Sequence, residues 1–435
     1  MTYAAPTERL ESRLPDGKPP YSDAEARAEA ERCLYCHDAP CVKACPTSID
    51  IPRFIQQIAT GDGLGAARTI MSSNILGYSC ARVCPVEVLC VGDCVYNPWH
   101  KPPIQIGKLQ RWATEGALAV EALGGRRVFT PRTAEKRRRV ALIGAGPASL
   151  ACAAYLALEG HEAVVFERGA LPGGLNTTGV APYKLHTEDS LREVDYVRSL
   201  GVEIRTGVEV GRDVSPESLA SDWDAVFLGL GLGDDTRTGV AGEDGPGVVG
   251  ATAFIARLKN EPGFGVDGVR RALVVGGGNT AIDVARELAK LGVPDVAMVY
   301  RRTAADMSGY AHEMAAARQE GVRLVERAQP AAVVRGADGG LTGLRVATPE
   351  GERELPADLV VLAIGQSKLR SLASSFPGVE LDKRGCVVVD PRTKRTGHAK
   401  VYAGGDCVNG GKEVVNAVAD GRDAARAMTA GWAEV

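Results

Sequence analysis

The chain has 435 residues, of which 45% are hydrophobic and 24% are charged, and this composition excludes a disordered or fibrous protein. A chain of this length has room for two or three domains, each with its own core. The formal net charge of -3 gives no electrostatic reason to expect nucleic acid or an anionic membrane as a partner. No hydrophobic run approaches transmembrane length, and residues 1–18 carry scattered charges without an apolar core. We therefore expect a cytoplasmic protein without a signal peptide.

The first 125 or so residues contain eight of the eleven cysteines and are predicted to be largely helical. Helical patterns cover residues 22–32, 51–60 and 106–123, with turn signals between them. In a reducing compartment, clustered thiols more often bind metal than form disulfides. The pattern therefore predicts a small helical module that is held together by metal.

The cysteines of this module form two runs, which read Cys33-x2-Cys36-x4-Cys41-x3-Cys45-Pro and Cys80-x3-Cys84-Pro-x4-Cys90-x3-Cys94. The bacterial ferredoxin run also ends in Cys-x3-Cys-Pro, and its last cysteine ligates the other cluster where two are present. By that logic Cys45 joins ligands from the second run. Zinc is the alternative, since thiolates also build tetrahedral structural sites. Two [4Fe-4S] clusters fit better, because zinc sites usually pair two Cys-x2-Cys knuckles and the second run has none.

Beyond a basic, polar stretch that ends near residue 139, short β-branched runs alternate with helical patterns. The pattern predicts strands over residues 140–143, 162–167 and 272–275 and helices over residues 148–159 and 280–291. Such alternation is typical of parallel sheets that are covered by helices. A glycine-rich junction from strand to helix occurs at Gly144 and again at Gly276. The sequence therefore predicts two dinucleotide-binding domains.

The first junction, Gly144-x-Gly146-x-x-Ser149, lies between an apolar strand and a helix. The first glycine makes the turn, and the second lets the backbone approach a pyrophosphate at the helix N-terminus. Glu167 ends the next strand about twenty residues on, where it is placed to accept hydrogen bonds from a ribose. An acid at this position suits an adenosine without a 2′-phosphate, as in FAD.

The second junction, Gly276-Gly-Gly278-Asn279-Thr280, repeats this design. Here the next strand ends in Arg301 and Arg302, so the position that reads the ribose is basic. Guanidinium groups pair bidentately with phosphate, which favours NADPH over NADH. A solvated pair of charges at a strand end is the alternative interpretation.

Near the C-terminus, Asp406 follows a short strand and precedes a predicted helix over residues 413–428. Its carboxylate is placed to bind a ribityl hydroxyl, while the helix dipole faces the electron-rich edge of a flavin. The expected architecture is α/β, with an all-helical domain that holds two [4Fe-4S] clusters followed by two Rossmann-like domains. The predicted domains are 1–128 for the clusters, 129–255 with 365–435 for FAD, and 256–364 for NAD(P)H.

Three segments, residues 31–50, 80–94 and 103–115, closely resemble the N-terminal half of dihydropyrimidine dehydrogenase. They are most similar to the separate FAD- and cluster-carrying subunit of the bacterial enzyme. The resemblance implies two sets of cluster ligands, Cys33, Cys36, Cys41 and Cys94 for one and Cys45, Cys84, Cys90 and Gln110 for the other. Spacing alone would offer Cys80 as the eighth ligand, whereas the resemblance implies that Cys80 packs nearby. An amide oxygen in place of a thiolate should alter the charge and potential of that cluster.

The resemblance also implies contacts to the two dinucleotides. For FAD these are Gly144, Gly146, Ala148, Ser149, Glu167, Gly174, Leu175, Lys184, Gly405 and Asp406. For the nicotinamide nucleotide they are Gly278, Asn279, Thr280, Arg301, Arg302 and Gly365. Lys184 stands where the family often has arginine, and His186 replaces the usual proline. The bacterial subunit is typically NADH-linked and the single-chain eukaryotic enzyme uses NADPH, so both cofactors stay open.

The expected activity is oxidation of NAD(P)H through FAD, with single electrons passed to the two clusters. No side chain need act as acid or base, so we assign no catalytic residue. A pyrimidine-reducing flavin barrel needs about 250 residues, and the nucleotide domains already use residues 130–435. We therefore expect a separate partner subunit that reduces uracil or thymine at the C5–C6 bond.

Two enzyme subunits share the expected architecture and are alternatives, the glutamate synthase small subunit and the related subunit of a ferredoxin-linked transhydrogenase. The segments 88–94 and 104–110 favour the pyrimidine branch. An alternative from another class is a non-catalytic scaffold with zinc in the cysteine module. Measuring flavin and iron content would distinguish this scaffold from the enzyme alternatives.

Overall fold

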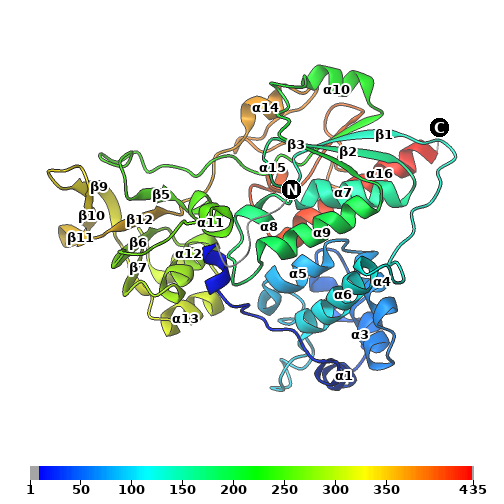
Figure 1. Ribbon diagram of the computed structural model, residues 1–435, viewed down its shortest axis with the longest axis horizontal. Coiled ribbons are helices and arrows are strands. Elements are labelled where there is room, and N and C mark those ends of the chain that lie inside the picture. The colour runs from blue at the N-terminus through cyan, green and yellow to red at the C-terminus, as the bar shows by residue number, and fades with distance from the viewer. Residues whose placement is uncertain (1–8, 434–435) are drawn as a thin grey trace. The chain divides into compact units, whose positions relative to one another are not determined.

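The computed structural model describes residues 9–433, which fall into two compact units (Figure 1). The larger unit comprises residues 18–177, 188–232 and 368–433, and the smaller unit comprises residues 9–17, 178–187 and 233–367. Residues 233–255, assigned above to the FAD domain, thus lie in the smaller unit.

The larger unit begins with the cysteine-bearing helices, drawn in blue and cyan in Figure 1. They are α1 (Asp23–Glu31), α2 (Pro40–Ala44), α3 (Ile51–Ala59), α4 (Gly63–Met71), α5 (Gly77–Val83) and α6 (Ile106–Ala122), with a short 3-10 helix at Val86–Val88. Helix α3 buries Ile51, Phe54, Ile55 and Ile58, which share one face at a spacing of three to four residues. The side chain of Asp50 caps this helix by accepting a hydrogen bond from the Arg53 amide.

A five-stranded parallel sheet follows, in the order β13-β4-β1-β2-β3. Its strands are β1 (Arg139–Ile143), β2 (Glu162–Glu167), β3 (Glu203–Thr206), β4 (Ala225–Leu228) and β13 (Val401–Ala403). The helices of this part are α7 (Pro147–Leu158), α8 (Leu175–Thr178), α9 (Thr187–Ser199), α10 (Pro216–Asp222), α14 (Arg370–Ser374), α15 (Asp406–Asn409) and α16 (Val414–Ala433). Strand β1 is apolar and buried from Val140 onward, as expected for a strand covered on both faces.

Helix α16 packs closely on α7 in the larger unit. A Cβ atom at Gly421 would lie 2.0 Å from the Ala148 carbonyl oxygen, so only glycine permits this approach. The same helix reaches the cysteine-bearing part, where the buried Arg422 guanidinium donates to the carbonyl oxygens of Thr47 (2.6 Å) and Ser73 (3.0 Å). One continuous apolar cluster joins the two parts, so they fold as a single body.

The smaller unit contains a second parallel sheet, in the order β5-β12-β6-β7-β8. Its strands are β5 (Val248–Gly250), β6 (Arg271–Val275), β7 (Asp295–Val299), β8 (Arg323–Val325) and β12 (Leu359–Leu362), and its helices are α11 (Ala251–Asn260), α12 (Asn279–Lys290) and α13 (Ala311–Gln319). An antiparallel sheet of β9 (Gln329–Arg335), β10 (Leu341–Thr348) and β11 (Gly351–Pro356) is inserted before β12. Short 3-10 helices occur at Leu10–Arg13 and Ala304–Asp306.

The predicted fold class is confirmed, since helices come first and two parallel sheets with covering helices follow. The predicted strand over 162–167 matches β2, and the helix predicted over 51–60 ends one residue earlier. The antiparallel insertion was not predicted. Among the described residues, no helix has the length and apolar character that a membrane crossing requires.

The Arg422 contacts predict a large effect of removing the guanidinium. Arg422→Ala would leave the Thr47 and Ser73 carbonyl groups without this charged donor in a buried place, so we expect the free energy of unfolding to fall by about 3 kcal/mol. Urea denaturation measures the change. Arg426→Ala is the matched control, because Arg426 is exposed and its contact with the Ser72 carbonyl oxygen is long, at 3.4 Å. An equal effect of both substitutions would contradict the prediction.

Candidate cluster and dinucleotide sites

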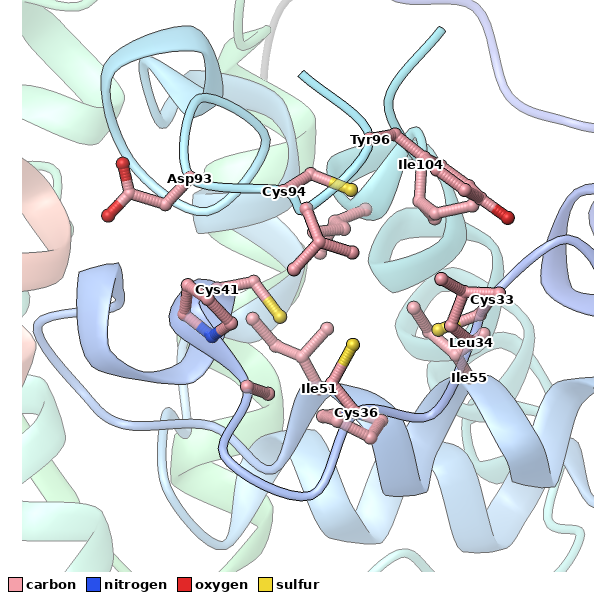
Figure 2. A pocket seen from close by; sticks show the side chains of 15 residues that line it. Cys33, Leu34, Cys36, Cys41, Ile51, Ile55, Asp93, Cys94, Tyr96 and Ile104 are labelled. Carbon is pink, nitrogen blue, oxygen red and sulfur yellow. The ribbon is translucent and has the colours of Figure 1, made fainter. Parts of the chain in front are cut away.

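The first cysteine site is a pocket lined by the loop after α1, by α2 and α3, and by the turns before α6. Figure 2 shows the sulfur atoms of Cys33, Cys36, Cys41 and Cys94 around it. Cys33 and Cys36 lie in the loop after α1, Cys41 lies in α2, and Cys94 comes from the second run. The chain therefore brings three cysteines of the first run together with the last cysteine of the second.

The other walls of this pocket are apolar. Ile51 and Ile55 of α3 and Ile104 line it together with the cysteines. Burial raises the pKa of Cys41 to about 12, and burial also raises the pKa of Cys33. Four such thiols would release their protons on binding metal, and this all-thiol set is the one that a [4Fe-4S] cluster uses. Within residues 9–433, no three His, Cys, Asp or Glu side chains are grouped closely enough to hold a single metal ion.

The second cysteine site lies between the end of α2, the end of α5 and the start of α6. Cys45 follows α2 and Cys84 follows α5, and Cys90 lies in the turns beyond. Burial raises the pKa of the Cys90 thiol, and the nearby thiols of Cys84 and Cys45 raise it further. These three side chains are thus close enough to interact.

Gln110 of α6 is buried, and its Nε2 atom donates to the Gly77 carbonyl oxygen of α5 at 2.7 Å. That hydrogen bond fixes which way the amide points and leaves its oxygen for another partner. Cys80 is 1% exposed, and its thiol hydrogen-bonds that of Cys84, which is the largest cause of the raised pKa of Cys84. Cys80 therefore lies at the second site, and Gln110 as the eighth ligand stays a prediction.

The first glycine-rich turn joins β1 to α7 in the larger unit. Gly144 has φ +85°, and a Cβ atom there would lie 2.6 Å from the Gly229 carbonyl oxygen. At Gly146 a Cβ atom would meet nothing within 4 Å, so the space beside this residue is open. Ser149 is buried in the first turn of α7. The turn fits a dinucleotide pyrophosphate, because the backbone is bare where the phosphates approach.

Glu167, at the end of β2, lies against this turn. Its carboxylate accepts hydrogen bonds from the amides of Ala145 (2.7 Å) and Gly169 (2.6 Å). Gly174, with φ +56°, approaches so closely that a Cβ atom would lie 2.8 Å from the Gly146 Cα, and Leu175 then begins α8. The carboxylate keeps further acceptor positions for ribose hydroxyl groups.

Gly405 and Asp406 complete this edge of the larger unit. A Cβ atom at Gly405 would lie 3.1 Å from that of Ala148, so the two predicted contacts are adjacent. Asp406 begins α15 and accepts a hydrogen bond from the Lys412 amide (3.1 Å), while burial raises its pKa. Asp420 of α16 was not predicted, and its carboxylate accepts a hydrogen bond from the Gly405 amide at 2.9 Å. No spacing signal marks it, because only tertiary packing brings it to Gly405.

Lys184 and His186, predicted near the flavin, belong to the smaller unit. The Lys184 ammonium group lies 2.7 Å from an Asp283 carboxylate oxygen and 2.9 Å from one of Glu313. Burial alone would lower the pKa of Lys184, but the two carboxylates raise it above its usual value. Within its unit, Lys184 is thus held as a charged residue by α12 and α13.

The second glycine-rich turn joins β6 to α12 in the smaller unit. Gly276 has φ +146°, and Gly278 precedes α12, which begins with Asn279 and Thr280. The Asn279 side chain accepts a hydrogen bond from the Tyr310 amide at 2.9 Å. Gly365 follows β12 with φ +109°, and a Cβ atom there would meet nothing within 4 Å. This bare turn also fits a dinucleotide.

Arg301 and Arg302 follow β7, and both side chains are exposed. The Arg302 guanidinium lies over the Tyr300 ring, 5.5 Å from its centroid. Exposed guanidinium groups at this strand end can reach a 2′-phosphate.

Comparison with known families agrees with these two kinds of site. Residues 11–122 match the model described as dihydropyrimidine dehydrogenase domain II, 4Fe-4S cluster. Residues 138–421, well over half of the chain, match the pyridine nucleotide-disulphide oxidoreductase model. The chain belongs to the pyridine nucleotide-disulphide oxidoreductase family. It is an NAD(P)H-dependent flavin oxidoreductase with an iron–sulfur domain, and the cluster domain decides for iron–sulfur over zinc.

Two relatives from Escherichia coli K12 with different functions are about equally similar to this chain. The glutamate synthase [NADPH] small chain is 34% identical, over 96% of this chain and 93% of its own. The NAD-dependent dihydropyrimidine dehydrogenase subunit PreT is 33% identical, over 94% of this chain and 95% of its own. Both relatives extend over the cluster domain and the two dinucleotide folds.

Solved structures are similar in fold to the dinucleotide-binding part. Thioredoxin reductase of T. acidophilum gives a TM-score of 0.57 at 23% identity, over 69% of this chain and all of its own. FprA of Mycobacterium tuberculosis in complex with NADPH gives a TM-score of 0.54 at 19% identity. The match covers 69% of this chain and 85% of the FprA chain. The predicted pair of Rossmann-like domains thus has the architecture of known flavin reductases.

The two glycines of the first turn predict different outcomes for the same substitution. Gly146→Val places a side chain in open space, so we expect flavin absorbance to fall at least tenfold while the thermal midpoint of the flavin-free protein stays unchanged. Gly144→Val clashes with the Gly229 carbonyl and strains the backbone, so it should lower stability by about 1–3 kcal/mol. Visible absorbance and thermal unfolding measure the two effects. Full flavin occupancy in the Gly146 variant would refute this assignment.

Proposed function

We propose that the chain is the electron-transfer subunit of a dihydropyrimidine dehydrogenase, which oxidises NAD(P)H and supplies a partner subunit that reduces uracil or thymine. The observation that carries this proposal is the cysteine module, which matches the dihydropyrimidine dehydrogenase domain over residues 11–122. The relative PreT, named as a subunit of that enzyme, supports a separate partner. Segments 88–94 and 104–110 lie within this matched domain.

The proposed roles of the residues are binding and positioning. When bound, the flavin supplies the conversion of a hydride into single electrons, and the clusters supply one-electron sites. Gly144, Gly146 and Ser149 would seat the pyrophosphate, and Glu167 would bind the ribose. Asp406, held by the Lys412 amide, would bind the ribityl chain. The two sets of ligands named above would hold the clusters, with Cys80 outside both sets.

The larger unit supports an order for the two cysteine sites. Lys412 and Glu413 follow Asp406 closely in the chain, and Glu413 acts electrostatically on Cys84 of the second site. Cys90 of the second site in turn lies near enough to Cys41 of the first for their charges to interact. Leu34, which is 49% exposed, lines the first site. We infer that electrons leave the flavin site for the second cysteine site and reach the surface from the first.

A second candidate function is the small subunit of a glutamate synthase, because that relative is 34% identical over nearly the whole chain. Both functions use the same half-reaction on this chain. They differ in the partner, so the partner decides between them.

The proposed function predicts how the purified chain behaves with and without partners. Alone, with either NADPH or NADH, it should reduce an artificial dye and leave uracil unchanged, since it only supplies electrons. Addition of a pyrimidine-reducing barrel subunit should couple nucleotide oxidation to uracil loss, measured by absorbance of both compounds. A glutamate synthase large subunit is the matched control. If nucleotide oxidation is coupled only to the glutamate synthase large subunit, the second candidate function replaces the proposal. Uracil turnover by the chain alone would show that no partner subunit is required.

The exposed arginine pair predicts a preference between the two nucleotides. If Arg301 and Arg302 bind a 2′-phosphate, either substitution by alanine removes a charged contact of about 1.5–3 kcal/mol and should raise the KM for NADPH roughly ten- to hundredfold. The KM for NADH should not change. Arg353→Ala, an exposed arginine of β11, is the control. Equal or better use of NADH by the unsubstituted chain would show that the pair does not select NADPH.

A further inference from the structure

The N-terminus of α5 is capped by a carboxylate from a distant helix. Glu193 of α9 is 2% exposed, and its Oε1 atom accepts hydrogen bonds from the amides of Tyr78 (3.0 Å) and Ser79 (3.3 Å). The Ser79 hydroxyl also donates to Glu193 Oε2. Amides at the first turn of a helix have no partner within the helix, so this carboxylate satisfies them and faces the positive end of the dipole.

The capped turn of α5 also orients the predicted amide ligand. Gly77 is the first residue of α5, directly before the two residues whose amides Glu193 binds. Its carbonyl oxygen accepts the 2.7 Å hydrogen bond from Gln110 Nε2. Glu193 therefore holds the first turn of α5 in place, and the Gly77 carbonyl of that turn orients the Gln110 side-chain amide. Cys84, another predicted ligand of the same site, follows the end of this short helix.

The surroundings of Glu193 leave its charge only partly compensated. Charged and titratable groups face this region from the packed elements: Tyr78, Arg82, Glu115, Tyr155, Asp189, Arg192 and Tyr196. Arg82 is the charge that acts on Glu193, but it is shared with Asp189 (3.3 Å) and Glu115 (3.5 Å). Burial raises the pKa of Glu193 to about 7, against the opposing effect of the Ser79 and Tyr78 hydrogen bonds and of Arg82. Near neutral pH the group is divided between its two protonation states.

We propose that Glu193 is a positioning residue for the second cysteine site, where it holds the Gln110 amide through α5 and takes up a proton when that site gains an electron. The proposal rests on the ligand set under the proposed function. The step balances, since one electron that originates in NAD(P)H enters the site and one proton from solvent converts the Glu193 carboxylate to the acid. Added negative charge near the carboxylate favours its neutral form, which is the physical cause of the coupling.

The test is the midpoint potential of each cluster in the purified holoprotein, measured by EPR-monitored redox titration at pH 6 and pH 8. One proton taken up per electron limits the change to about 59 mV per pH unit. We expect the potential of one cluster to be lower at pH 8 than at pH 6. Glu193→Gln, which keeps the size of the side chain but cannot lose a proton, should abolish this difference and leave the potential near the value at pH 6.

Two further variants make the outcome decisive. Asp195→Asn changes an exposed carboxylate on the same helix, which is paired with Arg198, and should keep the full pH difference. Ser79→Ala removes the hydroxyl donor that stabilises the Glu193 carboxylate, so the transition should move to higher pH even if the Glu193 variant fails to fold. Equal pH dependence in the parent and in both Glu193→Gln and Ser79→Ala, or no pH dependence in the parent, would overturn the proposal.

The partner plays no part in this measurement, so it is separate from a failure of the proposed function. Gln110→Ala checks the ligand set. An unchanged EPR spectrum and iron content in that variant would remove Gln110 as a ligand, and the proposal that Glu193 positions it would fall with it. A pH-dependent potential in the parent, lost only in the Glu193 variant, together with an altered spectrum in the Gln110 variant, supports the whole proposal.

Discussion

The close packing of α16 on the rest of the larger unit is the constraint on which both kinds of site depend. Gly421 lets this helix lie directly on the Ala148 carbonyl of α7, and α7 carries the dinucleotide turn at its start. One residue further, the Arg422 guanidinium reaches the cysteine-bearing part at Thr47. A single helix thus sets the separation between the flavin turn and the cysteine module. Under the proposed function electrons pass between these two regions, so a fixed separation within one body would serve that transfer.

Buried and half-buried carboxylates position the backbone at several places in this protein. Asp420 holds the Gly405 amide, Glu167 holds the Ala145 amide, and Glu193 holds the first turn of α5. In each case a carboxylate accepts from backbone amides that would otherwise have no partner, at a place where a cofactor is expected. Such contacts hold the backbone of a binding site in place, and Glu167 would in addition bind the ribose itself under the proposed function.

The two glycine-rich turns differ in the charge that accompanies them. The turn at Gly144 is accompanied by a carboxylate that is held against it, whereas the strand after the turn at Gly276 ends in two exposed arginines. A carboxylate would repel a 2′-phosphate, and guanidinium groups would attract one. The same backbone geometry can therefore serve FAD in the larger unit and a nicotinamide nucleotide in the smaller unit. Lys184, although predicted with the flavin contacts, is paired with Asp283 and Glu313 in the smaller unit.

The sequence by itself determined the fold class, the two glycine-rich turns and the clustering of the cysteines, because these depend on local patterns. An apolar strand, a bare turn and a helix follow one another within about twenty residues, and Cys33, Cys36 and Cys41 are near neighbours in the chain. The resemblance, and not spacing, grouped Cys94 with these three, and the structure places all four around one pocket. Only the tertiary structure decided that Lys184 pairs with α12 and α13, and that Asp420 and Glu193 hold the backbone at the sites. These contacts join residues that are 15 to more than 100 positions apart. Local periodicity cannot predict such contacts, because they follow from how whole helices pack.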